Sequence, residues 1–145
     1  MYAFSFTYVK AYICSMARHA KPFDLVPLFA ALADPTRLRL LNLMDGREVC
    51  VCYFVEILGQ SQPKISRHLA YLRRARIVEA RREGKWMHYR IERPDDAGAA
   101  SVLETTLASL KANRDMQNDL ARLGQACCQP QMFVTLQGAP MPVQV

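Results

Sequence analysis

The sequence predicts a mainly α-helical fold that includes one β-hairpin. Three observations support this prediction: apolar residues recur at helical spacing through most of residues 23–123, the spacing changes over residues 77–92, and breaks rich in Asp, Gly and Pro separate these segments. The chain has 145 residues, of which 51% are hydrophobic and 22% charged, so one domain can bury a core. We expect residues 23–123 to form that domain, between an N-terminal extension (1–22) and an irregular tail containing Cys and Pro (124–145).

Two helices are predicted ahead of residue 47. The first lies within "PFDLVPLFAALAD", where apolar residues repeat at helical spacing. The second, "DPTRLRLLNLMDG", carries its own boundaries: Asp34 suits the N-cap, Pro35 stands at the first helical position, and Asp45-Gly46 ends the helix. Both segments are expected to pack an apolar face inside the domain.

A third and a fourth helix follow, joined by a tight connection. "VCVCYFVEILG" (49–59) is predicted to be a short helix that ends at Gly59, and Ser61 can cap the helix after it. The fourth helix has an apolar stripe on one face and basic and polar residues on the other. Two short helices joined in this way are typical of a helix-turn-helix.

The segment "IVEARREGKWMHYRIE" (77–92) then changes to a period of two, and Glu83-Gly84 supplies a tight turn. These features predict a β-hairpin with Arg81, Arg82 and Lys85 near its tip. A hairpin directly after a helix-turn-helix is a wing, so the predicted fold is a winged helix-turn-helix.

A long amphipathic helix is predicted from about Ala97 to Leu123, ending at Gly124. Its apolar stripe needs a partner. The first helix, or the same helix of a second copy, can provide one, so we expect the chain to dimerise through its first and last helices.

The positive charge of the chain belongs to one segment. The formal net charge is +6, and the stretch from Lys64 to Arg93 holds ten Lys and Arg against three Glu, which leaves −1 for the remainder. This distribution favours an anionic partner such as nucleic acid. No run of 18 apolar residues is present, so no membrane span is predicted.

The first residues and the cysteines indicate whether the protein is secreted or remains in the cytoplasm. Residues 1–16 are apolar but are interrupted by Lys10 and have no basic residues ahead of them, so no secretion signal is predicted. Met16 offers an alternative start that would leave residues 1–15 outside the natural protein. Five cysteines form no regular disulfide framework, which favours a reducing, cytoplasmic location and free thiols.

The polar face of the fourth helix fits a helix that reads DNA. Gln and Arg side chains can bind base edges in the major groove, and Ser or Lys can bind phosphates, while basic residues of the wing fit phosphates or the minor groove. The simpler alternative is a solvated basic helix without a ligand. The candidate DNA-binding residues are Gln62, Lys64, Ser66, Arg67, His68 and Arg73 on the helix, and Arg81, Arg82 and Lys85 on the wing.

The residues from "LFAALADPTRLRLL" through "EVCVCYF" to "SQPKISRHLAYLRRARIVEARREGKW" resemble the ArsR/SmtB family of metal-sensing winged-helix repressors, and most closely its arsenical-resistance branch. The resemblance covers roughly residues 23–123. It implies a homodimer that binds a two-fold symmetric operator in double-stranded DNA and releases it when an inducer binds. It implies no enzyme activity and no organic cofactor, and the sequence shows no arrangement of residues that suggests catalysis.

Cys50 and Cys52 are the candidate inducer ligands. Thiolates are soft ligands that select Cu(I), Zn(II) or trivalent metalloids. In an α-helix, residues i and i+2 point about 200° apart, whereas two sulfurs bound to one atom at roughly 2.3 Å must lie within about 4 Å. Because both cysteines are expected to lie in the third helix, they cannot bind one atom from an intact helix, and binding should unwind or distort the start of that helix. The alternative is that both cysteines pack as small apolar side chains.

The identity of the inducer depends on further ligands. Many members of the resembled family have a third thiol at the position of Val55, and As(III) or Sb(III) prefers three sulfurs. Cys127 and Cys128 are candidates to complete the site, as is Cys14, from the same or the other subunit; the tail pair could also form its own site or remain unused. A trivalent organoarsenical with one carbon substituent needs only two thiolates, which Cys50 and Cys52 can supply.

Other functions remain possible from the sequence. The same fold could respond to thiol oxidation, or to Cd(II) or Zn(II), although the family's zinc site on the last helix is disfavoured because residues 97–123 contain no histidine. A winged helix can also serve protein contacts without binding DNA.

Overall fold

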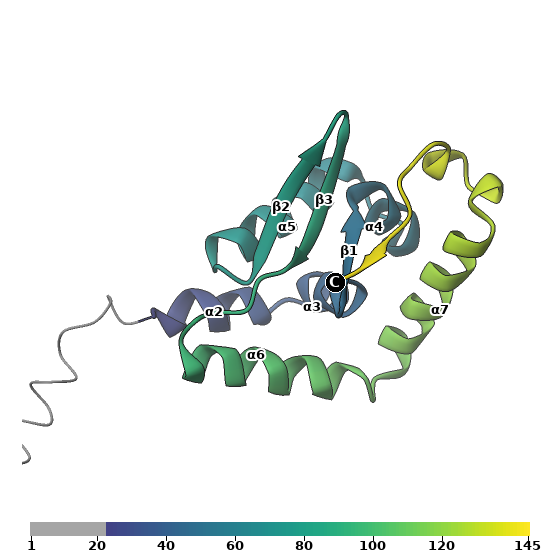
Figure 1. The fold of residues 1–145 in the computed structure, drawn as a ribbon. Coiled ribbons are helices and arrows are strands. Elements are labelled where there is room, and N and C mark those ends of the chain that lie inside the picture. The colour runs from purple at the N-terminus through teal and green to yellow at the C-terminus, as the bar shows by residue number, and fades with distance from the viewer. Residues whose placement is uncertain (1–22) are drawn as a thin grey trace, which may run out of the picture.

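The computed structural model describes residues 23–145, and the expectations for residues 1–22, including Met16 and Cys14, lie outside this part of the chain (Figure 1). The predicted winged helix-turn-helix, mainly helical with a β-hairpin, is confirmed. The helices are α2 (Leu25–Leu32), α3 (Pro35–Met44), α4 (Val51–Leu58), α5 (Gln62–Arg74), α6 (Ala97–Leu110) and α7 (Arg114–Cys128), with the short 3-10 helices η1 (Pro130–Met132) and η2 (Val134–Leu136). The strands are β1 (Arg47–Cys50), β2 (Val78–Glu83), β3 (Trp86–Ile91) and β4 (Val143–Gln144).

The predicted boundaries of α3 are confirmed. The Asp34 carboxylate accepts a hydrogen bond from the backbone N–H of Arg37 at 2.9 Å, and Pro35 begins the helix. The helix ends at Met44, and Gly46 follows with a φ of 71°, in the left-handed region that glycine adopts at little cost. Local cap chemistry is therefore sufficient to set this element.

The predicted start of the third helix is wrong. Residues 47–50 form strand β1, Cys50 has extended backbone angles (φ −69°, ψ 143°), and α4 begins only at Val51. The cause is tertiary, because β1 pairs antiparallel with β3, with Val49 opposite Tyr89 and Cys50 opposite His88. Pairing with a strand almost 40 residues away gives the backbone of residues 49 and 50 hydrogen bonds that a helix would otherwise supply.

The predicted long last helix is two helices. Its apolar stripe continues, but Asn113 caps a new helix by accepting hydrogen bonds from the backbone N–H groups of Asp115 and Met116. After this break α7 runs in a different direction from α6 and packs against α3 and α4 (Figure 1). The predicted end at Gly124 is also wrong, because α7 continues through Cys128.

The sheet has the strand order β2-β3-β1-β4, and all its pairings are antiparallel. The wing is the β2–β3 hairpin, in which Glu83 faces Trp86 across a two-residue turn. The tail contains more regular structure than the irregular segment expected: it crosses α4, against which η2 packs, and ends as β4 beside β1 (Figure 1).

The core lies between the helix-turn-helix and the sheet. Tyr53 and Phe54 of α4 and Ile65 and Leu69 of α5 are among its fully buried side chains. No helix within residues 23–145 combines the length and the apolar character that crossing a membrane requires.

Candidate nucleic-acid interface and thiol pair

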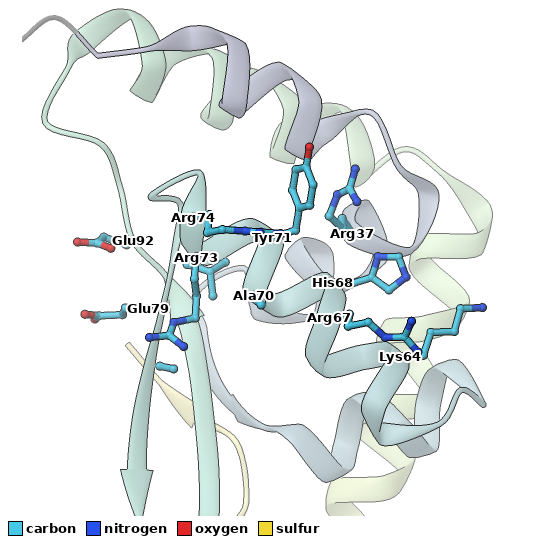
Figure 2. A pocket seen from close by; sticks show the side chains of 12 residues that line it. Arg37, Lys64, Arg67, His68, Ala70, Tyr71, Arg73, Arg74, Glu79 and Glu92 are labelled. Carbon is cyan, nitrogen blue, oxygen red and sulfur yellow. The ribbon is translucent and has the colours of Figure 1, made fainter.

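Helix α5 is held with its basic face outward. It follows Gly59, which has a φ of 62° and ends α4, and Ser61 precedes it as predicted although the Ser61 hydroxyl makes no capping hydrogen bond. The apolar side of α5 packs against α3 and α4. The opposite side lines an open groove of about 980 Å³, and Figure 2 shows Lys64, Arg67 and Arg73 projecting from the helix along it.

Most of the predicted DNA-binding residues are accessible. His68 differs from the others because it contacts another part of the protein: its Nδ1 atom lies 3.5 Å from the carboxylate of Asp34 at the start of α3. At the wing tip, Lys85 lies over the ring of Trp86, 4.8 Å from its centroid. Gln62, Lys64, Arg67, Arg73, Arg82 and Lys85 are exposed, whereas Ser66 and His68 are half-buried.

Arg37 of α3 also lines the groove, although it is not among the residues predicted from the sequence to bind DNA. Its guanidinium donates hydrogen bonds to the carbonyl oxygens of Ala30 and Ala31 at 2.8 and 2.7 Å, and it stacks 4.3 Å from the centroid of the Tyr71 ring. These contacts tie α2 to α5. Its place in "DPTRLRLL" gives no local signal of this, because the partners come from two other helices.

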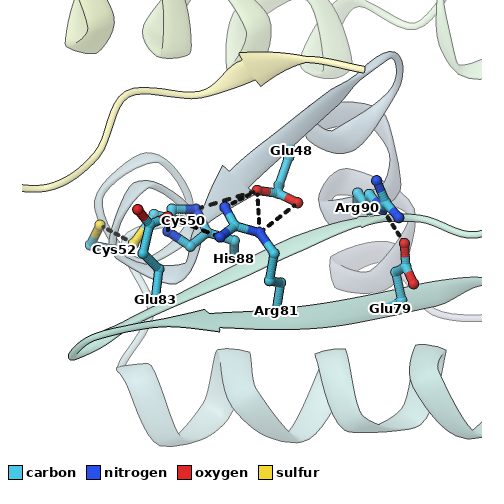
Figure 3. Close-up of polar contacts among 8 residues, drawn as sticks. All are labelled: Glu48, Cys50, Cys52, Glu79, Arg81, Glu83, His88 and Arg90. Carbon is cyan, nitrogen blue, oxygen red and sulfur yellow. Dashed lines mark hydrogen bonds and ion pairs between the residues drawn. The ribbon is translucent and has the colours of Figure 1, made fainter.

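The two central cysteines lie together at the junction of β1 and α4. The thiol of Cys52 donates a hydrogen bond to the Sγ atom of Cys50, and the sulfurs are 2.9 Å apart (Figure 3). Cys50 is buried and Cys52 is half-buried. The separation exceeds the length of a disulfide bond, about 2.05 Å, and is within the roughly 4 Å limit for two sulfurs bound to one atom.

The geometric reason for expecting the third helix to unwind or distort on binding is therefore wrong. It assumed that both cysteines are helical, but Cys50 is an extended N-cap and only Cys52 belongs to α4. The strand-to-helix junction brings the two sulfurs to the same side of the chain. Both thiols can reach one atom while α4 stays intact.

The hydrogen bond makes the two thiols unequal. It lowers the pKa of Cys50 to about 7, against the opposing effect of burial, because the Cys52 thiol stabilises the Cys50 thiolate. The same hydrogen bond, with burial, raises the pKa of Cys52. Cys50 is therefore the thiol that ionises first and the stronger nucleophile near neutral pH.

Within residues 23–145, Cys127 and Cys128 do not join Cys50 and Cys52 in a cluster of three potential metal ligands. Cys127 is half-buried and Cys128 exposed at the end of α7. Burial, followed by the charge of Cys127, raises the pKa of Tyr53 to about 12, and the buried Tyr53 hydroxyl has no hydrogen-bond partner among the described residues. Within residues 23–145, no three His, Cys, Asp or Glu side chains are grouped closely enough to hold a metal ion.

The sheet face that carries Cys50 also holds a polar network that the sequence did not reveal. Glu48 is 7% exposed and accepts hydrogen bonds from Arg81 Nη2 at 2.6 Å and Nε at 3.2 Å (Figure 3). This contact lowers the pKa of Glu48. His88 is 4% exposed beside the pair, with Nδ1 3.9 Å from Glu48 Oε1 and Nε2 3.5 Å from Glu83 Oε2. Arg81, a predicted DNA contact, is thus engaged within the sheet.

Comparisons with known proteins agree with this arrangement. The family model described as "Bacterial regulatory protein, arsR family" matches residues 34–80. The arsenical resistance operon repressor of Escherichia coli K12 is 46% identical over 80 residues, covering 54% of this chain and 68% of that protein. The arsenic resistance transcriptional regulator ArsR1 of Pseudomonas putida is 51% identical over 65 residues, covering 44% of this chain and 51% of that protein.

A solved structure is also similar. Reduced HlyU from Vibrio cholerae has a TM-score of 0.50 and 31% sequence identity to this chain, and the match covers 61% of this chain and 88% of that one.

Proposed function

The chain belongs to the ArsR family of bacterial regulatory proteins, and we propose that it is a repressor that binds operator DNA as a homodimer and releases it when a thiophilic metalloid binds Cys50 and Cys52. The names of two relatives, an arsenical resistance operon repressor and an arsenic resistance regulator, support a metalloid signal. The exposed basic face of α5 supports DNA as the partner.

One observation carries the proposal: the Sγ atoms of Cys50 and Cys52 lie 2.9 Å apart at the start of α4, and α4 packs directly against α5. A shared ligand atom holds its two sulfurs further apart than this, up to about 4 Å. Binding therefore shifts the end of β1 relative to the first turn of α4. Because α4 supports α5 from behind, the shift changes how α5 is presented to DNA.

The ligand set favours an inducer that needs two thiolates. A trivalent organoarsenical with one carbon substituent fits Cys50 and Cys52 without a third sulfur. As(III) or Sb(III) would draw the third sulfur from Cys127, Cys128 or Cys14, of the same or the other subunit. Soft sulfur donors and the lowered pKa of Cys50 are compatible with either choice.

Operator contact is assigned to the exposed face of α5 and to the wing tip. The polar residues at the start of α5 would enter the major groove, and the wing residues would contact phosphates. A dimer is supported by apolar side chains that α2 leaves in solvent: Leu25, Val26 and Phe29 are 40%, 74% and 54% exposed. Pairing of α2 and α6 between two copies would cover them.

The test is a titration of the protein bound to a DNA fragment that it has itself selected from a random pool. Arsenite, methylarsenite, Cd(II) and Zn(II) are added in turn, and bound DNA is measured by fluorescence anisotropy. We expect the Cys50→Ser and Cys52→Ser variants to bind the fragment but to ignore methylarsenite, while Cys128→Ser, at an exposed position, responds as the parent protein does. A full methylarsenite response in both Cys50→Ser and Cys52→Ser would show that the thiol assignment is wrong.

A second signal, oxidation, is favoured by the same contact. A Cys50 thiolate can attack hydrogen peroxide to form a sulfenic acid and release hydroxide, which takes up a proton to become water. The Cys52 thiol can then attack the sulfenic sulfur and displace its oxygen as water, which forms a disulfide. A sulfur separation of 2.9 Å and a pKa of about 7 for Cys50 both suit this reaction. Release of DNA by peroxide but not by arsenite or methylarsenite would identify oxidation as the signal.

A further inference from the structure

We propose that the Glu48–Arg81 pair couples the thiol pair to the wing, so that occupancy of Cys50 and Cys52 changes the position of the hairpin as well as that of α5. The inference rests on the proposed function for its input, a ligand on the two thiols. It assigns Arg81 to signal transmission within the sheet and not to a phosphate contact.

The register of the sheet places Cys50, His88 and Arg81 in one row across three strands. Cys50 on β1 faces His88 on β3, and His88 faces Arg81 on β2. Residues opposite each other on antiparallel strands project from the same face, and so do residues two apart on one strand. Glu48, two residues before Cys50, therefore shares this face with Arg81 and His88, as Figure 3 shows.

The Arg81–Glu48 ion pair joins two strands that are not neighbours in the sheet. In the order β2-β3-β1, strand β3 separates the strand of Arg81 from that of Glu48, so the Arg81 side chain spans the central strand to reach the carboxylate. Its Nη1 atom also donates to Glu83 at 3.0 Å on the wing. Arg81 thus joins the strand that ends in Cys50 to the tip of the hairpin.

The burial of Glu48 keeps Arg81 paired with it when β1 moves. The Glu48 side chain is 9% exposed, so its charge has little water to replace Arg81 if the two separate. Leaving a buried carboxylate unpaired is costly, and Arg81 must follow Glu48 when β1 moves. His88, opposite Arg81 on the central strand, is enclosed beside the pair, and its Nε2 atom lacks a hydrogen-bond partner among the described residues.

The wing carries its own reporter. Trp86 is the single tryptophan of the chain, is half-buried, and faces Glu83 at the hairpin turn. Its fluorescence therefore reports on the wing without any DNA. The same sheet face supplies a matched control in the Arg90–Glu79 ion pair, which joins β3 to β2 but does not include β1.

The experiment compares Glu48→Gln, Arg81→Gln and the control Glu79→Gln in the full chain. Arg81 is half-exposed, so Arg81→Gln tests the pair even if Glu48→Gln fails to fold. Each protein is titrated with methylarsenite, and three quantities are followed: loss of free thiols, Trp86 emission, and the ratio of operator affinities without and with the ligand. Coupling between sites in proteins is typically about 5- to 150-fold, which sets the release expected of the parent protein.

We expect Glu48→Gln and Arg81→Gln to lose free thiols on titration as the parent protein does. Their Trp86 response and their ratio of operator affinities should each be reduced at least about five-fold, the lower end of the typical coupling between two sites. Glu79→Gln is expected to match the parent protein. Parental release and Trp86 responses in both test variants would overturn the proposal. So would a silent Trp86 in the parent when its thiols are occupied.

Different outcomes of this experiment would contradict the coupling and the proposed inducer. If methylarsenite leaves DNA bound but Trp86 still responds to thiol occupancy through Glu48 and Arg81, the coupling stands and the proposed inducer is wrong. If methylarsenite releases DNA equally from the parent, Glu48→Gln and Arg81→Gln, the proposed function stands and the coupling is wrong.

Discussion

The thiol of Cys52 donates its hydrogen to the sulfur of Cys50, and the two atoms are 2.9 Å apart across the junction between a strand and a helix. This contact is possible because the backbone of Cys50 is extended while Cys52 lies in the first turn of α4. It creates one thiol that ionises readily and one that retains its proton.

The titration of Cys50 should depend on Cys52. The pKa of Cys50 is lowered to about 7, so the thiolate fraction rises as the pH increases through 7, below the ordinary value of about 8.5. Replacing Cys52 with Ala removes the hydrogen-bond donor and leaves burial, so the midpoint should move to higher pH. The measurement is thiolate ultraviolet absorbance against pH, with the Cys50→Ser variant subtracted. An unchanged midpoint in Cys52→Ala would contradict this account.

DNA affinity should depend on salt through α5. If Lys64 contacts a phosphate, Lys64→Ala should reduce the slope of log K against log salt by about 0.9. Lys111 offers the control, because it is exposed in the connection between α6 and α7 and pairs with Asp45 at 3.2 Å. Lys111→Ala should leave the slope unchanged. Equal slopes for Lys64→Ala and the parent would exclude a phosphate contact at Lys64.

The connection of α7 to α3 should be important for stability. The buried carboxylate of Asp119 accepts two hydrogen bonds from Arg39, at 2.6 and 2.7 Å. Asp119→Ala should lower the free energy of unfolding by about 3 kcal/mol, the lower end for breaking a buried pair, because Arg39 is partly exposed. Urea unfolding measures this. Asp115→Ala, on an exposed position of the same helix, should cost less than about 1 kcal/mol, and equal losses would argue against a special role for Asp119.

Two glycines should respond in opposite directions to the same substitution. Gly59 has a φ of 62°, so Gly59→Ala should cost about 1–2 kcal/mol of stability through backbone strain alone, since an added Cβ meets no atom within 4 Å. Gly124 lies within α7 and is equally open. Gly124→Ala should stabilise the protein by about 0.5–1 kcal/mol through helix propensity. Thermal unfolding of both variants tests the contrast, and a stabilising Gly59→Ala would show that the turn relaxes.

Features set by local chemistry could be predicted from the sequence. Asp34 and Pro35 determine the start of α3, and the apolar stripe of α5 determines its buried side, since neither depends on distant residues. The strand ending at Cys50 could not be predicted, because its partner His88 is 38 residues away and "EVCVCYF" fits a helix when considered alone. Asn113 did carry a local capping signal, but the continuous apolar stripe around it favoured one long helix.

In the candidate site, too, some features could be predicted from the sequence and others depend on contacts between distant residues. The exposed residues of α5 follow from helical spacing, and the closeness of Cys50 and Cys52 in sequence identifies them as a pair. The role of Arg81 does not follow, because a basic residue near a hairpin tip suggests solvent or phosphate, and its partner Glu48 comes from another strand. Only the assembled sheet brings the two side chains together.

The short strand β4 has a practical consequence for experiments on this protein. It pairs with the first residues of β1, and the backbone N–H of Val145 donates to the carbonyl oxygen of Gly46 at 3.1 Å. An affinity tag or fluorescent fusion attached after Val145 would therefore begin beside the turn that leads into the sulfur-bearing segment. A bulky label at this position could displace β1, the strand that ends at Cys50. Inducer titrations of protein with a C-terminal tag should therefore be compared with titrations of the same protein after the tag has been removed.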